Sequence, residues 1–198
     1  MGKKGLPSAL KAAAEAHPEK RIALYFQDGR AQVTLDRVGQ KGRVCYRWWL
    51  RDQRPPGLHD NRFEYAYIFA AVEPATGNDF CLVLPSVSTT AMSVFLRGFS
   101  EQLAPDVHAV LVLDGAGWHV AAALRVPDNV TLMKLPPYAP ELNPIERVWL
   151  YLRERFLSHR LHADQEAVMD AACKAWNRLT PQRLRSLCNY PWIRQVTS

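Results

Sequence analysis

The sequence of 198 residues predicts an α/β fold in which a mixed sheet is flanked by helices. In the first half, short strand-like runs separated by turn signals indicate an antiparallel meander. In the second half, helix-like and strand-like stretches alternate, which is typical of strands joined through helices. Residues 109–113 (Ala-Val-Leu-Val-Leu) are wholly apolar, so this strand should be covered on both faces near the centre of the sheet.

The N-terminal elements are short. Residues 1–20 are predicted to be a linker with a polar helix at 8–16, ahead of one domain that covers residues 21–198. Residues 21–27 read as a buried strand that ends at the turn signal Asp28-Gly29. Further strands of the meander are predicted at residues 33–35, 44–50, 64–72 and 80–84.

The later elements follow from the spacing of apolar residues. Helices are predicted at residues 89–103, 117–124 and 163–179, with a last helix at 181–188. Strands are predicted at residues 109–113 and 130–135. With the helices distributed between the strands, both sides of the sheet should be covered.

A proline-rich loop at residues 136–144 leads into one more helix, whose apolar stripe is Ile145, Val148, Trp149, Leu152 and Phe156. Asn143 is a good N-cap, and Pro144 suits the first turn because its missing N–H costs nothing there. Glu146 lies off the stripe, near the positive end of the helix dipole. It is either the partner of Asn143 in a capping box or a functional carboxylate.

The net charge of +6 is concentrated in two segments. Residues 30–54 carry seven Lys or Arg and two Asp, and residues 178–198 carry four Arg and no acid. Such segments suit a polyanion, and nucleic acid is the commonest one, whereas the alternative is a solvated basic surface. We expect a cytoplasmic protein with reduced thiols, because there is no membrane-length apolar run, no signal peptide and no CxxC motif.

Three acidic residues are candidates for a metal site. Asp28 and Asp114 each follow an apolar strand and precede a glycine, and Glu146 could reach the same edge of the sheet from the start of its helix. Converging carboxylates repel one another unless cations neutralise them, and hard oxygen ligands suit Mg²⁺ or Mn²⁺. Two such ions about 4 Å apart can clamp an in-line phosphoryl transfer. Beside a basic surface, the expected substrate is a nucleic-acid phosphodiester.

Three stretches carry a family resemblance: Tyr25-Phe26-Gln27-Asp28, residues 111–119 (Leu-Val-Leu-Asp-Gly-Ala-Gly-Trp-His) and the proline loop through Asn-Pro-Ile-Glu-Arg-Val-Trp at residues 143–149. Together they resemble DDE transposases of the mariner superfamily, specifically the bacterial insertion-sequence six-thirty branch. The resemblance covers nearly the whole chain from about residue 20. The 31 residues between Asp114 and Glu146 are close to the family's spacing.

The resemblance implies a ribonuclease H-like catalytic domain in which Asp28, Asp114 and Glu146 bind two Mg²⁺ or Mn²⁺ ions. It implies DNA cleavage at transposon ends and strand transfer into target DNA, at TA sites, by a homodimer in the bacterial cytoplasm that associates with the nucleoid. The expected DNA contacts are Arg30, Lys41, Arg43, Arg47, Trp118, His119, Asn143 and Arg147. For Trp118 and His119, simple packing is the alternative.

Two features depart from the family. Gly29 stands where the family usually has Glu directly after its first Asp, and the residues before 20 are too few for the amino-terminal helix-turn-helix modules that bind transposon ends. The end-binding region is therefore expected to be separate or missing. The alternatives are a decayed or repurposed DNA-binding or assembly module without catalysis, and a nuclease or resolvase of the same fold.

Overall fold

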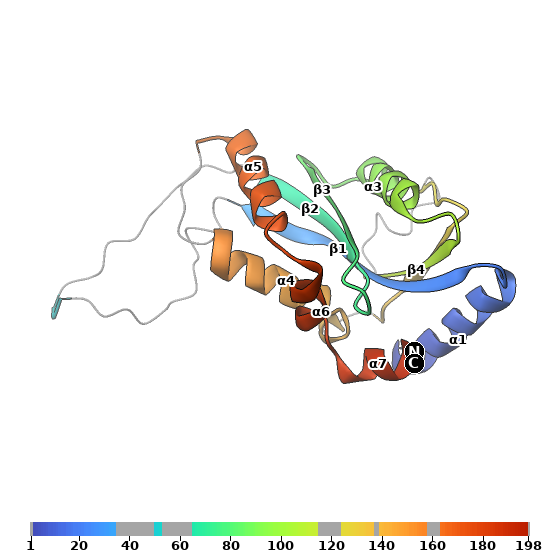
Figure 1. Cartoon of the computed structure of the whole chain (residues 1–198). Coiled ribbons are helices and arrows are strands. Elements are labelled where there is room, and N and C mark those ends of the chain that lie inside the picture. The colour runs from blue at the N-terminus through green and yellow to red at the C-terminus, as the bar shows by residue number, and fades with distance from the viewer. Residues whose placement is uncertain are drawn as a thin grey trace.

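A five-stranded mixed sheet forms the centre of the structure, a computed structural model, in the order β3-β2-β1-β4-β5 (Figure 1). The strands are β1 (Arg21–Thr34), β2 (Tyr65–Val72), β3 (Asp79–Leu84), β4 (Val107–Leu113) and β5 (Val130–Lys134). The β1–β2 and β2–β3 pairs are antiparallel, and the β1–β4 and β4–β5 pairs are parallel. The structure describes residues 2–34, 50–52, 65–114, 124–136, 139–157 and 163–197. The predicted fold class, a meander joined to parallel strands and flanked by helices, is confirmed.

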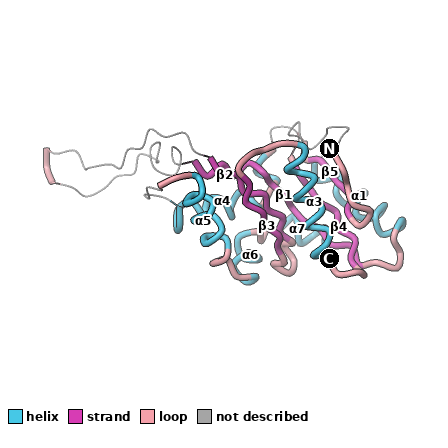
Figure 2. The backbone as a smooth tube through the Cα atoms, turned by 90° about the horizontal axis from the view of Figure 1, so that it is seen from above, coloured by secondary structure: helices cyan, strands magenta, loops and turns pink. Residues whose placement is uncertain are grey.

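Helices cover both faces of this sheet (Figure 2). On one face, α3 (Thr89–Gln102) packs through an apolar stripe against β1, β2 and β4. The other face is covered by α1 (Gly2–Ala16) and α7 (Pro191–Thr197), which pack over β1 and β4. On the same face, α4 (Ile145–Leu152), α5 (Gln165–Trp176) and α6 (Pro181–Leu187) pack over β2.

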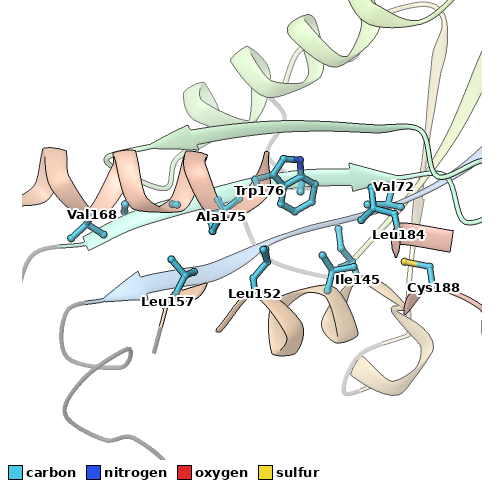
Figure 3. Close-up of a cluster of buried hydrophobic side chains, with 14 residues drawn as sticks. Val72, Ile145, Leu152, Leu157, Val168, Ala175, Trp176, Leu184 and Cys188 are labelled. Carbon is cyan, nitrogen blue, oxygen red and sulfur yellow. The ribbon is translucent and has the colours of Figure 1, made fainter. Parts of the chain in front are cut away.

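The cluster over β2 fixes the position of α4. Alternate residues of β2, two of them alanines that allow close approach of the helices, form its floor. Ile145 and Leu152 of α4 and Leu184 of α6 are fully buried on it, with Trp176 of α5 beside them (Figure 3). The spacing of buried residues in α4 is the stripe that the sequence predicts. Because this stripe faces the sheet, it sets the orientation of α4 and therefore the positions of the other side chains on this helix.

The first strand extends further than predicted. It was expected to end at residue 27, but β1 continues to Thr34 and includes residues 33 and 34 of the next predicted strand. The pairing of β1 with β2 shifts register between Asp28 and Ala31, so a bulge absorbs the Asp-Gly pair instead of a turn. The extension exists because β2 provides a partner for the backbone beyond residue 28.

Other boundaries differ by a few residues. The helix expected at 8–16 begins at Gly2, and its Leu6 and Ala13 are buried in the core. The helix expected at 181–188 is not the last, because α7 follows it. After α4 the chain continues as a π-helical turn, Arg153–Leu157. The strand predicted at 44–50 and the helix predicted at 117–124 lie almost entirely outside the described residues, and Leu50 and Leu124 belong to no strand or helix.

Among the described residues, no helix is both long enough and apolar enough to cross a membrane.

The buried His108 of β4 makes the stability of the protein depend on pH. Its Nε2 lies 2.8 Å from the Thr131 hydroxyl, its ring stacks on that of His17, and among the described residues its Nδ1 has no hydrogen-bond partner. Burial, with the nearby charges of His17 and Lys20, lowers the pKa of His108 below its usual value, although Glu19 opposes this.

Because the pKa of His108 is lower in the folded state, the unfolded chain binds more protons as the pH falls below about 6.5. We therefore expect the free energy of unfolding to decrease between pH 7 and pH 5.5, and to decrease less in His108→Gln, which cannot titrate but can still bond Thr131. Urea denaturation at several pH values measures the free energy of unfolding of the wild type and of the variant. Equal pH dependence in the two would remove His108 as the cause.

Candidate active site

The parallel pairing of β1 with β4 brings two of the predicted acids to adjacent positions. The pairing ends with Phe26 opposite Val112, and Asp28 and Asp114 each lie two residues further along their own strands. Neighbouring strands are about 4.8 Å apart, so the two aspartates occupy the same edge of the sheet. Asp28 is 2% exposed, and Asp114 is partly buried.

The carboxylate of Asp28 is oriented by α4. Trp149 of that helix donates a hydrogen bond from its indole Nε1 to Asp28 Oδ2, at 3.2 Å. The indole also packs against Trp176, with ring centroids 5.7 Å apart, which holds Trp149 in the helix cluster over β2. Asp28 therefore faces the side of the sheet that α4 covers.

A second hydrogen bond ties the start of α4 to the same strand. Asn143, which is 3% exposed, donates from its side-chain Nδ2 to the backbone oxygen of Gln27, at 3.1 Å. Its Oδ1 accepts from the backbone N–H of Ile145, at 3.3 Å. The predicted N-cap at Asn143 is corrected, because the N-cap is Pro144 and makes no side-chain cap bond. The Asn143 amide instead joins the loop to β1, directly beside Asp28.

Glu146 is exposed in the first turn of α4. It precedes Trp149 by three residues, and residues so spaced on a helix are neighbours with Cβ atoms about 5–6 Å apart. Glu146 therefore lies one helical turn along α4 from Trp149, the residue that bonds Asp28. The described residues contain no group of three or more His, Cys, Asp or Glu already placed to hold a metal ion. The structure thus pairs Asp28 with Asp114 and positions Glu146 nearby, without closing the three into one cluster.

The donor set fits a hard divalent cation. All the side-chain donors of Asp28, Asp114 and Glu146 are carboxylate oxygens, the ligands that Mg²⁺ and Mn²⁺ prefer. Two adjacent aspartates, one of them buried, provide the negative charge that such an ion would neutralise. A tightly closed cage is unnecessary, because Mg²⁺ usually keeps several waters and is held by one or two carboxylates.

The predicted DNA contacts are only partly described. Arg147 is exposed, with its guanidinium 4.6 Å from the centroid of the Tyr190 ring. Asn143 is buried, and its side chain forms hydrogen bonds with the backbone of Gln27 and Ile145. The side chain of Arg30 lies outside the described part of the chain, and so do five whole residues: Lys41, Arg43, Arg47, Trp118 and His119.

Sequence reasoning missed the role of Trp149. Its place in the apolar stripe predicted a core side chain, and its ring is indeed packed in the core cluster. The role could have been suspected from the indole N–H, because a buried Trp usually directs that group to a hydrogen-bond partner. Here the partner is Asp28, 121 residues away in the sequence.

Residues 33–169 match the model of the DDE superfamily endonuclease family. The match covers more than half of the chain, so this protein belongs to that family. The matched segment includes Asp114 and Glu146 and begins after Asp28. The predicted DDE family is therefore confirmed, whereas the insertion-sequence six-thirty branch stays a prediction.

A bacterial relative and several solved structures resemble the chain. The uncharacterized protein y4pE/y4sA of Sinorhizobium fredii (strain NBRC 101917 / NGR234) is 48% identical over 118 residues, which cover 60% of this chain and 87% of that protein. The Mos1 transposase paired-end complex with left transposon end matches with a TM-score of 0.67 and 14% identity, covering 98% of this chain and 60% of that chain. The Mos1 strand transfer complex matches with a TM-score of 0.64 and 13% identity, covering 97% of this chain and 58% of that chain.

This chain therefore spans about 60% of the length of the solved proteins that it matches. At such identities the likeness shows the fold, and it confirms the predicted ribonuclease H-like arrangement of strands and helices.

Proposed function

We propose that this chain is the catalytic part of a transposase that cuts DNA at transposon ends and joins the freed 3′ end to target DNA at TA sites, with Mg²⁺ or Mn²⁺ as cofactor. One observation carries the proposal: Asp28 and Asp114 lie at adjacent positions on parallel strands, beside a helix that carries Glu146 and is tied to β1 at residues 27 and 28. Membership of the DDE superfamily endonuclease family supports it.

Asp28, Asp114 and Glu146 are the residues that would hold the metal ions, two per site. A bound divalent cation lowers the pKa of water and stabilises negative charge on a phosphate in phosphoryl transfer. The residues of the chain itself prepare this site: Trp149 orients Asp28, and Asn143 holds the start of α4 against β1. Crystal structures of the Mos1 paired-end complex have been solved with Mn and with Mg, which supports the choice of cofactor.

The proposed partners are transposon-end DNA, target DNA and a second copy of the chain. The net charge of +6 suits DNA. The Mos1 structures are named as paired-end and strand transfer complexes, which supports DNA ends as ligands and a homodimer that pairs them. A helix-turn-helix region would recognise the end sequence, in a bacterial cytoplasm where the protein associates with the nucleoid.

The test is metal-dependent cutting followed by joining. The wild-type chain is first titrated with Mn²⁺ by calorimetry, which requires no knowledge of the end sequence. It is then incubated with supercoiled plasmid and with DNA that carries candidate ends, in Mn²⁺ or in EDTA. Joining of a cut end to plasmid supports a transposase, and cutting without joining indicates a nuclease or resolvase. DNA binding with neither reaction would indicate a non-catalytic module and overturn the proposal.

Removal of the indole donor tests how the site is positioned. Trp149→Phe keeps an aromatic ring in the cluster but leaves Asp28 without this hydrogen bond. We expect Mn²⁺ affinity or the cutting rate to fall by at least about tenfold, the lower range for groups that orient a metal ligand. The free energy of unfolding should change by only about 1 kcal/mol.

Trp176→Phe is the matched control, because the indole of Trp176 belongs to the same cluster but donates to Asp79, at 2.6 Å. Mn²⁺ affinity and cutting should be unchanged in this variant. An equal loss in both variants would mean that packing of the helices, and not the contact with Asp28, is responsible.

A further inference from the structure

A groove of about 520 Å³ runs along α3 from its first turn to Arg97, between the helix and residues 125–127. We call it the α3 groove. The described residues that line it include Arg97 on the helix and Arg125 on the facing segment, with no acidic residue among them. Both arginines are exposed, and neither has an ion pair within the described part of the chain. The groove therefore presents two positive charges that no carboxylate of its wall neutralises.

The helix wall follows from the period of α3. Thr90, Ser93 and Arg97 stand at positions i, i+3 and i+7, so they share one face of the helix. The buried stripe, which includes Phe95 and Phe99, occupies the opposite face and packs on the sheet. Thr90 and Arg97 are the exposed members of this face, whereas Ser93 is half-buried and its hydroxyl is already hydrogen-bonded within the protein.

The opposite wall is held in place by a hydrogen bond. The backbone N–H of Arg125 donates to the Ser93 hydroxyl oxygen, at 3.4 Å, and that hydroxyl donates in turn to the backbone oxygen of Thr89, at 2.9 Å. Further along, the side chain of Asn129 accepts from Ser100 at 2.6 Å. The segment that carries Arg125 is thus fastened to α3 at both ends.

The α3 groove begins at the edge of the sheet that holds the candidate active site. Because β2 is antiparallel to both β1 and β3, β3 runs in the direction of β1 and ends on the side of Asp28 and Asp114. The helix α3 follows β3 directly, so its first turn lies toward this edge (Figure 1). The facing segment, residues 125–127, is on the chain that returns from Asp114 to β5.

We propose that the α3 groove binds backbone phosphates of a DNA segment that passes over the active-site edge of the sheet. Arginine and Ser/Thr side chains are common donors to DNA phosphates, and such contacts position the duplex without reading its sequence. The dipole of α3 adds positive potential at its first turn, where the Ser88 hydroxyl already accepts from the N–H of Ala91. The proposal rests on the proposed function and adds a surface that contains none of the predicted DNA contacts.

The test compares the salt dependence of DNA binding by the full chain and by the double variant Arg97→Ala/Arg125→Ala. Anisotropy of a labelled 30-base-pair duplex of arbitrary sequence is measured between 50 and 200 mM NaCl in EDTA. Each phosphate contact contributes about 0.9 to the slope of log K against log salt concentration. The slope should therefore decrease in magnitude by about 1.8, and Arg97→Lys/Arg125→Lys should restore most of it.

The matched control is Lys11→Ala/Lys174→Ala, which removes the same charge from α1 and α5, on the other face of the sheet. Its slope should change by less than half as much as that of the arginine variant. An equal change in both variants, an unchanged slope in the arginine variant, or no binding by the wild type at 50 mM NaCl would overturn the proposal. A change in oligomeric state by sedimentation with an unchanged slope would assign the groove to a protein partner and also overturn it.

The salt-dependence and cutting experiments distinguish failure of the groove proposal from failure of the proposed function. If the wild type cuts DNA but the slope is unchanged in the arginine variant, the groove is wrong and the catalytic proposal stands. If the slope decreases as expected but no metal-dependent cutting occurs, the groove is a DNA site on a non-catalytic module.

Discussion

Asp114→Asn is expected to lower the rate of metal-dependent DNA cutting by about 10²- to 10³-fold while the protein stays folded. The amide has the shape of the carboxylate but lacks its negative charge, so it cannot neutralise a divalent cation beside Asp28. Asp28→Asn and Glu146→Gln should have effects of the same order. In Asp28→Asn the side-chain oxygen can still accept the hydrogen bond from Trp149, so the position of α4 should be kept.

These variants are measured by nicking of supercoiled plasmid in Mn²⁺, with thermal unfolding monitored by circular dichroism. Glu141→Gln is the matched control, since Glu141 is an exposed acid in the turn just before α4 and plays no part in the proposed site. It should cut DNA at the wild-type rate. Any one of the three site variants that retains wild-type cutting would remove that residue from the site.

Gly77→Ala should destabilise the protein by roughly 3 kcal/mol, through backbone strain and overlap together. Gly77 has a φ of 79°, a left-handed conformation that disfavours side chains with a Cβ. A Cβ built there would lie 2.8 Å from the carbonyl carbon of Pro181 and closer still to its oxygen. The obstacle is backbone at the start of α6, so it cannot move aside as a flexible side chain could.

The turn that contains Gly77 also organises a buried carboxylate. Glu73 is 3% exposed and accepts hydrogen bonds from Arg21 at 2.9 Å, from Thr76 at 2.7 Å and from Asn78 at 3.1 Å. A shift of the turn in Gly77→Ala would weaken these bonds and leave a buried charge less well paired, which adds to the destabilisation.

Gly5→Ala is the matched control for this variant. Gly5 lies within α1, and its added Cβ would meet only the Met133 methyl at 3.7 Å, an ordinary contact. Alanine should stabilise the helix there by about 0.5–1 kcal/mol. Urea denaturation of both variants measures the difference in the free energy of unfolding. A Gly77→Ala variant as stable as the wild type would show that the start of α6 can shift away from the added methyl group without loss of stability.

Elements with a strong local pattern could be predicted from the sequence. The wholly apolar run of β4 predicts a strand near the centre of the sheet, and β4 lies between β1 and β5 with each of its residues buried. The apolar stripe predicted for the helix after the proline loop includes the residues that α4 buries, Ile145, Val148 and Leu152. In each case, the pattern of apolar residues that burial requires is present within a single segment.

Elements that depend on distant partners were missed or misplaced. The continuation of β1 past Asp28 has no local signal, because it exists through pairing with β2, which follows more than 30 residues later. The seven residues of α7 are too few to show a period, and the helix is held by Ile193 and Trp192 against the sheet and α1. For such segments, tertiary packing supplies the stability that local propensity lacks.

By itself, the sequence determined the fold class, the DDE family and the identity of the three candidate acids. Only the tertiary structure decided that Asp28 and Asp114 stand side by side, and that Trp149 and Asn143 tie α4 to the strand that carries Asp28. These contacts join residues 86 to 121 positions apart, and a local pattern carries no information about such pairs. They form because the sheet register and the buried stripe of α4 together leave one position for each side chain.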